Sequence, residues 1–342
     1  MTGNFELVAI GNPLLDMQVR DGEEVLKKYD LKANDAILAE EKHMPIYKEI
    51  VDKYDVAYVA GGASQNAARC AQYVLPENST AYFGCVGEDH LSEQLRAANK
   101  KEGLRSVYQV KPEVPTGSCA VVITGHHRSL CTNLGAAEKF DKSHLQSEEA
   151  QKLIKGAKYF YMEGFFLTHG VESAMVLAKE AADRGVPFVI NLSAPFIPQF
   201  FTSQLNEFLA YSQIVFGNET EAEAYAEASN LGTKDLTKIA QAIADGPNKT
   251  GKPRRVIISH GAEDTVLAIS GESSAKTFPT PQIASENIVD TNGAGDAFAG
   301  GVLGALIAGK STEEAISIGQ KLGGMCIGQS GPVLKFPKEK IF

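Results

Sequence analysis

Short apolar runs separated by polar or glycine-rich turns recur along most of the chain. Beyond about residue 135, apolar runs at 159–162, 188–190, 214–216 and 256–258 alternate with helical patterns, including one at 171–184. A strand buried on both faces in a parallel sheet reads as such a continuous apolar run. The pattern therefore predicts an α/β fold in which a central, mostly parallel sheet carries helices on both faces.

The first part of the chain mixes the same pattern with extended pieces. Strands are expected at 7–10 and 81–86, and helices at 22–33, 41–54 and 91–101. Residues 116–124 and 129–134, joined by a turn at 125–128, are typical of a β-hairpin. We expect the hairpin and the helix-poor pieces around 14–40 to pair into a small β-rich lid. Its segments are discontinuous, approximately 14–60 and 112–136, within one domain spanning 1–342.

Composition narrows the classes of partner. The chain has 342 residues, 44% of them hydrophobic and 22% charged, which is typical of an ordinary globular protein. Its net charge of −9 argues against wrapping nucleic acid or an anionic membrane surface. We find no run of 18 or more apolar residues and no secretory leader pattern. Five scattered cysteines without CxxC spacing predict free thiols in a reducing compartment.

The richest candidate chemistry lies at residues 288–301. Two apolar residues, expected to end a strand, precede a turn of small and polar residues from Asp290 to Asp296, and a helix follows over 297–308. Such a turn directs free backbone N–H groups and the positive end of a helix dipole at one point. With the Asp296 carboxylate beside it, the turn suits phosphoryl transfer to a hydroxyl group. The alternative is an ordinary glycine-rich turn in which Asp296 only caps the helix.

Polar residues also follow other predicted strands. Asn12 and Asp16 come after the strand at 7–10, where ligands bind in open α/β sheets, although an Asx-capped turn is the alternative. Gly61 and Gly62 lead into a second helix of small residues, with Asn66 one turn into it. We place Arg128 at the tip of the lid hairpin, where it is either a phosphate clamp or a surface arginine.

One motif is set aside. Residues 304–311 satisfy the P-loop pattern GxxxxGK[ST], but a working P-loop needs a strand before it and a turn with free amides. Here the stretch is predicted to be the end of a helix, with Gly309 just beyond its last turn. Ser311 and Glu314 then match a capping box for the next helix.

Taken together, the motifs resemble the ribokinase-like (PfkB) carbohydrate and nucleoside kinases, and within them the branch that acts on adenosine. The segments that carry this resemblance run in the expected order across almost the whole chain: Gly11–Asp16 (GNPLLD), Ala60–Asn66 (AGGASQN), Asn191–Phe196 (NLSAPF), Asn218–Glu221 (NETE) and Asp290–Asp296 (DTNGAGD). The resemblance implies a ribokinase-like fold. It also implies transfer of the ATP γ-phosphate to the 5′-hydroxyl of adenosine, giving AMP and ADP in purine salvage.

The resemblance also implies roles for individual residues. Asp296 would be the base, Arg128 would meet the transferring phosphate, and Gly293, Ala294 and Gly295 would form an anion hole. The expected nucleoside-binding residues are Asn12, Asp16, Gly61, Gly62 and Asn66 around the ribose, and Leu14, Leu38, Cys119, Leu130 and Phe166 around the adenine. The expected ATP-side residues are Asn191, Asn218, Glu221, Ser259, Gly261 and Asn292. Asn218 and Glu221 would hold Mg²⁺ through water, and backbone carbonyls around Asp290 would hold a monovalent cation such as K⁺.

The expected partners are adenosine and ATP, with neither nucleic acid nor membrane. We expect a monomer located in the cytoplasm, with the nucleus as a further location. Two other functions stay open at this point: a kinase for another nucleoside or a sugar, and a non-catalytic nucleoside-binding protein. Ala36, Ala63 and Gln320 differ from the residues of some relatives, which leaves purine selectivity and nucleotide preference undecided.

Overall fold

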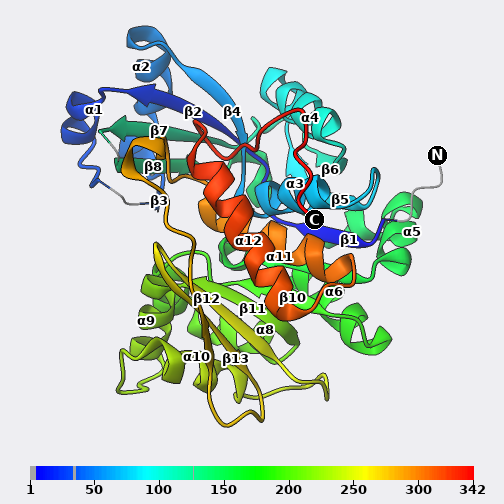
Figure 1. Ribbon diagram of the computed structural model, residues 1–342. Helices are drawn as coiled ribbons and strands as arrows, with labels where there is room; N and C mark the ends of the chain where they lie inside the picture. The colour runs from blue at the N-terminus through cyan, green and yellow to red at the C-terminus, as the bar shows by residue number, and fades with distance from the viewer. Residues whose placement is uncertain (1–4, 34–35, 126) are drawn as a thin grey trace.

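The larger of two sheets organises the molecule (Figure 1). The computed structural model describes residues 5–33, 36–125 and 127–342. Within these residues the larger sheet has nine strands, in the order β14 (Lys276–Phe278), β13 (Glu263–Ile269), β12 (Arg255–His260), β11 (Ser212–Asn218), β10 (Phe188–Asn191), β9 (Tyr159–Glu163), β1 (Leu7–Ile10), β5 (Thr80–Val86) and β6 (Arg105–Val110). The seven strands from β12 to β6 are mutually parallel, and β13 and β14 are antiparallel additions at one edge. The predicted mostly parallel α/β sheet is confirmed.

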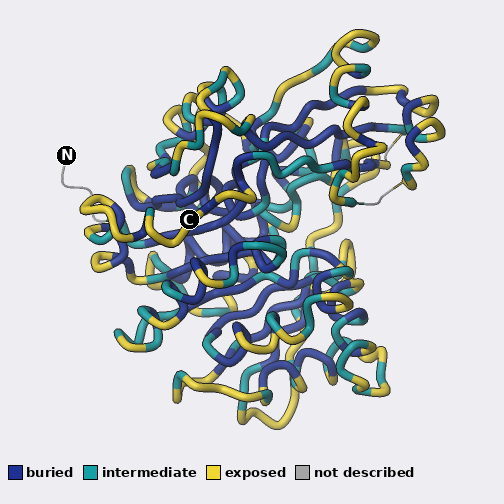
Figure 2. The backbone as a smooth tube through the Cα atoms, turned by 180° about the vertical axis from the view of Figure 1, so that it is seen from behind, coloured by how far each residue is buried: buried dark blue, intermediate teal, exposed yellow. Residues whose placement is uncertain are grey.

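Successive residues of each strand contact opposite layers of the core. In β1, Val8 and Ile10 pack into one hydrophobic cluster, whereas Leu7 and Ala9 pack into the other. This alternation follows from the two-residue period of a strand. Because both faces are buried, the strand reads as an unbroken apolar run in the sequence. Figure 2 shows buried stretches of the chain in the interior and exposed stretches at the periphery.

Helices cover both faces of the sheet. The first face is covered by α5 (Glu148–Gly156), α6 (Val171–Arg184), α7 (Phe196–Phe200), α8 (Thr202–Leu209), α9 (Glu219–Ala228) and α10 (Leu236–Ala244). The second is covered by α3 (Ala63–Val74), α4 (His90–Glu102), α11 (Ala294–Ile307) and α12 (Thr312–Ile327). Five 3₁₀ turns are also described, η1 (Glu41–His43), η2 (Gly135–Lys139), η3 (Lys142–Gln146), η4 (Gly164–Thr168) and η5 (Ser285–Asn287).

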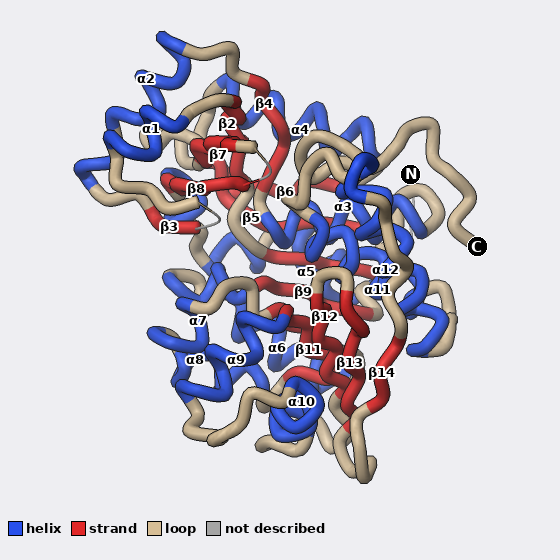
Figure 3. The backbone as a smooth tube through the Cα atoms, turned by 60° about the vertical axis from the view of Figure 1, so that its left-hand side comes forward, coloured by secondary structure: helices blue, strands red, loops and turns tan. Residues whose placement is uncertain are grey.

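The smaller sheet projects from one end of the larger one (Figure 3). Its five described strands run in the order β3 (Ala36–Leu38), β8 (His127–Asn133), β7 (Ser118–Thr124), β2 (Leu14–Arg20) and β4 (Ala57–Gly61). We call this sheet, with α1 (Glu23–Lys28) and α2 (Pro45–Lys53), the lid. The two helices pack on one face of the sheet in a separate small core, so the other face is left to look toward the body.

Three local predictions need correction. Residues 288–289 do not end a strand, because the N–H groups of Val289 and Asp290 donate to the carbonyl of Ile327 at the end of α12. The expected helix at 22–33 is only α1, since Asp30 has a left-handed φ of 55°. Arg128 lies within β8, opposite Ile123 of β7, and not in the hairpin turn.

Two other local predictions are confirmed. Residues 304–307 are the last turn of α11, which excludes the P-loop reading, and Gly309 has a left-handed φ of 84°. Ser311 and Glu314 form the capping box of α12.

The five cysteines are buried free thiols. Among the helices that the structure describes, none has both the length and the apolar character needed to span a bilayer.

Candidate active site

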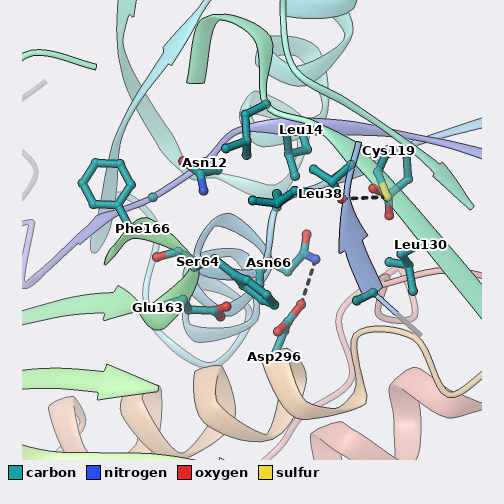
Figure 4. A pocket seen from close by; sticks show the side chains of 18 of the residues that line it. Asn12, Leu14, Leu38, Ser64, Asn66, Cys119, Leu130, Glu163, Phe166 and Asp296 are labelled. Atoms are coloured by element: carbon teal, nitrogen blue, oxygen red, sulfur yellow. Dashed lines mark hydrogen bonds between the residues drawn. The ribbon is translucent and has the colours of Figure 1, made fainter. Parts of the chain in front are cut away.

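A cavity of about 220 Å³ lies where the inner face of the lid meets the carboxyl ends of the central strands (Figure 4). We call it the first cavity. It brings together most of the residues predicted to bind a nucleoside: Asn12, Leu14, Asp16, Leu38, Gly62, Asn66, Cys119, Leu130 and Phe166. It also reaches Asn292, Gly293, Gly295 and Asp296. Segments far apart in sequence therefore share one space, as the motifs predicted.

One side of the first cavity is apolar. The lid contributes Leu14, Leu38 and Leu130, and Phe166 comes from η4 on the body. Cys119 of β7 is also buried there, and its sulfur accepts a hydrogen bond from the Thr132 hydroxyl at 3.3 Å. Such a wall suits a flat heteroaromatic group, whose faces lose water when it enters.

The opposite side is polar and held by a fixed hydrogen-bond chain. The Arg69 guanidinium donates to the side-chain oxygen of Asn66 at 2.9 Å, so the Asn66 amide nitrogen faces Asp296 and donates to it at 2.9 Å. Asp16, only 5% exposed, lies on the same side. Burial raises the pKa of Asp16 to about 7, and the Arg69 guanidinium opposes that rise. Two carboxyl groups are therefore presented to the cavity on a rigid support.

The Gly61–Gly62 pair allows the segments on the polar side of the first cavity to pack closely together. Gly62 has a φ of 87°, and a Cβ atom there would lie 2.2 Å from the Asn12 carbonyl oxygen. Gly61 does not line the cavity, but a Cβ atom there would lie 2.3 Å from the Asp16 carboxylate. The glycines thus let the strand carrying Asp16 and the loop carrying Asn12 approach the start of α3.

Asp296 stands in the first turn of α11, and Gly293 caps that helix with a left-handed φ of 76°. The amide of Ala294, predicted to serve the anion hole, is already engaged, because it donates to the Thr291 carbonyl at 3.3 Å. The amides of Gly295 and Asp296 have no acceptor among the described residues. Burial raises the pKa of Asp296 to about 6, although the Asn66 hydrogen bond opposes the rise. The carboxyl group is therefore mostly ionised at neutral pH and still basic enough to accept a proton.

A second cavity of about 120 Å³ adjoins the first and shares Ala63, Glu163, Phe165, Gly295 and Asp296 with it. Its lining includes four of the residues predicted to lie on the ATP side: Asn191, Asn218, Glu221 and Ser259. Two others are placed differently. Asn292 lines the first cavity, and Gly261 lines neither, standing between β12 and β13. Asp296 thus lies at the junction of two spaces of different character.

Asn218 and Glu221 form a reciprocal cap at the start of α9. The Asn218 side-chain oxygen accepts from the Glu221 amide at 2.9 Å, and both Glu221 oxygens accept from Asn218 groups at 2.9 Å. Burial raises the pKa of Glu221 to about 7. Among the described residues, no three His, Cys, Asp or Glu side chains are close enough to hold one metal ion together.

Arg128 reaches the body from the lid. Its guanidinium forms an ion pair with Asp290, and the two side chains are 7% and 0% exposed. The amides of Asn292 and Gly331 also donate to Asp290. Arg128 lines neither cavity, although its partner stands in the loop that leads directly to α11. The lid and the loop that leads to α11 are therefore joined by a buried charge pair.

Glu163 and His169 are among the polar side chains at the site that sequence reasoning missed. Glu163, 3% exposed, lines both cavities and accepts from the Tyr161 hydroxyl at 3.0 Å. Burial and the nearby Asp296 carboxylate raise the pKa of Glu163 well above its usual range. A signal existed, because Glu163 ends a buried parallel strand at the ligand-binding edge. His169 contacts Asn12, and no local pattern points to that contact.

Comparisons with known proteins agree with this arrangement. The model of the pfkB family of carbohydrate kinases matches residues 24–339. An adenosine kinase of Schizophyllum commune is 54% identical over 341 residues, covering 99% of each chain. The crystal structure of Anopheles gambiae adenosine kinase in complex with P1,P4-di(adenosine-5) tetraphosphate has a TM-score of 0.93 at 44% identity, covering 97% of each chain. Adenosine kinase from Schistosoma mansoni in complex with 2-fluoroadenosine also has a TM-score of 0.93, at 35% identity and 98% coverage of each chain.

Proposed function

The chain belongs to the pfkB family of carbohydrate kinases, and we propose that it is an adenosine kinase. The reaction transfers the γ-phosphate of ATP to the 5′-hydroxyl of adenosine and releases AMP and ADP. The observation that carries the proposal is the position of Asp296, between an apolar-walled cavity and an acidic one, at the start of α11. A base and two free amides there can serve an acceptor on one side and a phosphate donor on the other.

The first cavity is the adenosine site. Adenine lies against the apolar wall, and Phe166 is its aromatic neighbour on the body. The ribose faces Asn12, Asp16 and Asn66, where an ionised Asp16 accepts hydrogen bonds from ribose hydroxyl groups. This places the two ends of the nucleoside against walls of matching polarity.

Asp296 accepts the 5′-hydroxyl proton as the oxygen attacks phosphorus. Phosphoryl transfer needs positioning and charge stabilisation more than covalent help. The amides of Gly295 and Asp296, together with the α11 dipole, stabilise the negative charge on the transferring group. Arg128 adds a positive charge once the arriving phosphate replaces Asp290 as its partner.

The lining of the second cavity suits the Mg²⁺-bound phosphate groups of ATP. Its described lining contains three carboxyl groups, Glu163, Glu221 and Asp296, and neither lysine nor arginine. No basic side chain of this lining balances the charge of a polyphosphate, and Asn218 and Glu221 offer the oxygen groups that hold hydrated Mg²⁺. When bound, Mg²⁺ supplies positive charge to the donor phosphates. A monovalent cation such as K⁺ near the Asp290 carbonyl is part of the same proposal.

We also propose that the protein is a monomer. A lid sheet whose outer face lacked cover would favour pairing with a second copy. In this chain α1 and α2 bury that face, with Val25, Ile46 and Ile50 in their common core with the sheet.

The test is ADP release over a panel of adenosine, other nucleosides and simple sugars, with and without Mg²⁺. We expect adenosine to give the highest kcat/KM, in a reaction that needs Mg²⁺. Asp296→Asn should fold and bind adenosine but lose roughly 10²–10⁴-fold in turnover, the usual contribution of a positioned base. Near-normal turnover of that variant would show that Asp296 is not the base. A preference for a sugar would show that the protein is a kinase for another acceptor. Absence of ADP with every acceptor would show that it is a non-catalytic binding protein.

A further inference from the structure

His169 contacts two of the residues that line the first cavity. Its Nε2 atom lies 2.9 Å from the side-chain oxygen of Asn12. Its ring also packs edge-on against Phe166, with ring centroids 5.0 Å apart and an interplanar angle of 75°. Asn12 belongs to the polar side and Phe166 to the apolar wall, so one side chain supports both.

The tautomer of His169 follows from its surroundings. Burial lowers the pKa of His169 to about 4, so the ring is neutral at physiological pH and carries a single N–H. Nδ1 is buried and has no hydrogen-bond partner among the described residues. A proton on Nδ1 would bury a donor without an acceptor, which is costly. The proton therefore sits on Nε2, which donates to Asn12.

This donation decides how Asn12 presents its amide. A carboxamide has an acceptor end and a donor end, and they exchange when the group turns by half a rotation. With the Asn12 oxygen engaged by His169, its NH₂ group is the end left for the cavity. Asn12 then offers a donor to an oxygen atom of the ligand. Without His169, both orientations of the amide become accessible.

We propose that His169 is a positioning residue for nucleoside recognition, which turns the Asn12 amide toward the ribose and braces Phe166 beside the purine. The proposal rests on the proposed function, because it assumes that a nucleoside occupies the first cavity. His169 itself lines neither cavity and so acts through Asn12 and Phe166.

Two variants separate the two contacts. His169→Phe keeps an aromatic ring against Phe166 and removes the donor, whereas His169→Gln keeps an N–H donor at similar reach and removes the ring. The matched control is His144→Phe. His144 also packs edge-on against a phenylalanine, Phe140, at 5.8 Å and bonds the Val107 carbonyl at 3.0 Å, but it does not line the first cavity.

The ligands are adenosine, 2′-deoxyadenosine and 3′-deoxyadenosine, with Kd measured calorimetrically without ATP and KM and kcat measured with it. For His169→Phe we expect Kd and KM for adenosine to rise roughly tenfold, the effect of one hydrogen bond, with a smaller change in kcat. The rise should disappear for the analogue lacking the hydroxyl that Asn12 contacts. His169→Gln should restore most of the affinity, and adding His169→Phe to Asn12→Ala should cost nothing further.

An equal loss for adenosine and both deoxy analogues, or no rescue by His169→Gln, would overturn the proposal. Thermal melting of each ligand-free variant checks folding, and His144→Phe should show no change in hydroxyl discrimination. Wild-type protein that binds adenosine without forming ADP would overturn only the proposed function, because the binding arm tests His169 by itself. Wild-type protein that binds no adenosine would overturn both.

Discussion

Two buried arginines show how differently this chain treats positive charge. Arg254 is 1% exposed and precedes β12. Within the part of the chain that the structure describes, its guanidinium donates only to backbone carbonyls, those of Leu209, Ser212, Ile243, Ala244, Gly246 and Pro247. Arg128 stands in β8 of the lid and pairs with the Asp290 carboxylate in the loop before α11. The first arginine is held by neutral dipoles of the body, and the second by a charge of opposite sign.

The kind of partner determines what each arginine can do. Carbonyl groups of the backbone cannot leave, so Arg254 ties the ends of α8 and α10 to the sheet permanently. A carboxylate can be replaced by another anion with little loss, since both form charge-assisted hydrogen bonds with a guanidinium. Arg254 is therefore a fixed crosslink, whereas we propose that Arg128 can exchange Asp290 for a phosphate.

The largest effect that tests this comparison should come from Arg254→Met. Removing the guanidinium leaves several buried carbonyls without donors, which should lower the free energy of unfolding by about 3–5 kcal/mol. Urea unfolding measures this loss. The control is Arg255→Met, one residue along and half-buried, which should cost less than about 1 kcal/mol. Equal unfolding midpoints for the two variants would show that Arg254 is not a crosslink.

The next largest effect is expected from Arg128→Met, and it should fall on turnover. We expect kcat to drop on the order of 10²-fold, the usual loss when one preorganised donor to transition-state charge is removed. Adenosine affinity should change much less. Stability should fall less than with Arg254→Met, because Asp290 keeps the amides of Asn292 and Gly331.

Arg20→Met is the matched control for Arg128, since Arg20 and Arg128 both lie opposite Ile123 in the lid sheet. It removes one positive charge from the same row of the sheet and should leave kcat within a few-fold of wild type. If both variants slow turnover equally, the net charge of the lid matters and the Arg128–Asp290 exchange does not.

The smallest expected effect is a change of stability with pH, and it tests Asp296 without mutating either arginine. The pKa of Asp296 in the folded protein, about 6, lies above the ordinary value of an aspartate, so the folded protein binds this proton more tightly than the unfolded chain. The resulting stability is present at low pH and is lost as pH rises through 6. Between pH 5.5 and pH 8 the loss should be about 1 kcal/mol for Asp296 alone.

Asp296→Asn cannot show that loss, so its stability relative to wild type should improve by the same amount between pH 5.5 and pH 8. Thermal unfolding of the ligand-free proteins at both pH values measures it. A parallel pH dependence in the two proteins would mean that burial of Asp296 is not a source of instability. Arg254 stays charged between pH 5.5 and pH 8, so it contributes no such pH dependence of stability.

The sequence predicted those features that depend on neighbouring residues. The parallel sheet followed from apolar runs, and the start of α11 from a glycine-rich turn before small residues. The capping box at Ser311 and Glu314 was predicted for the same reason. Each depends on the geometry of only a few consecutive residues.

Features that depend on distant partners were missed. Arg254 follows an exposed polar loop at 245–253, and no local pattern indicates that it is buried against carbonyls of Leu209 and Ser212 as well as of that loop. The His169–Asn12 contact joins residues 157 positions apart. The pair at 288–289 resembled a strand end because its apolar character was visible, whereas its hydrogen-bond partner, the carbonyl of Ile327 in α12, was not.

The pairing of the lid strands also has a consequence for how the protein folds. β2 and β7 run side by side in parallel, with Leu15 opposite Ser118, although roughly a hundred residues of chain separate them. That intervening chain includes α3, β5, α4 and β6, all of which belong to the body. Closing so long a loop is entropically costly until the intervening segment is compact. The lid sheet should therefore form after this part of the body, and a ribosome must release β8 before the sheet can be completed.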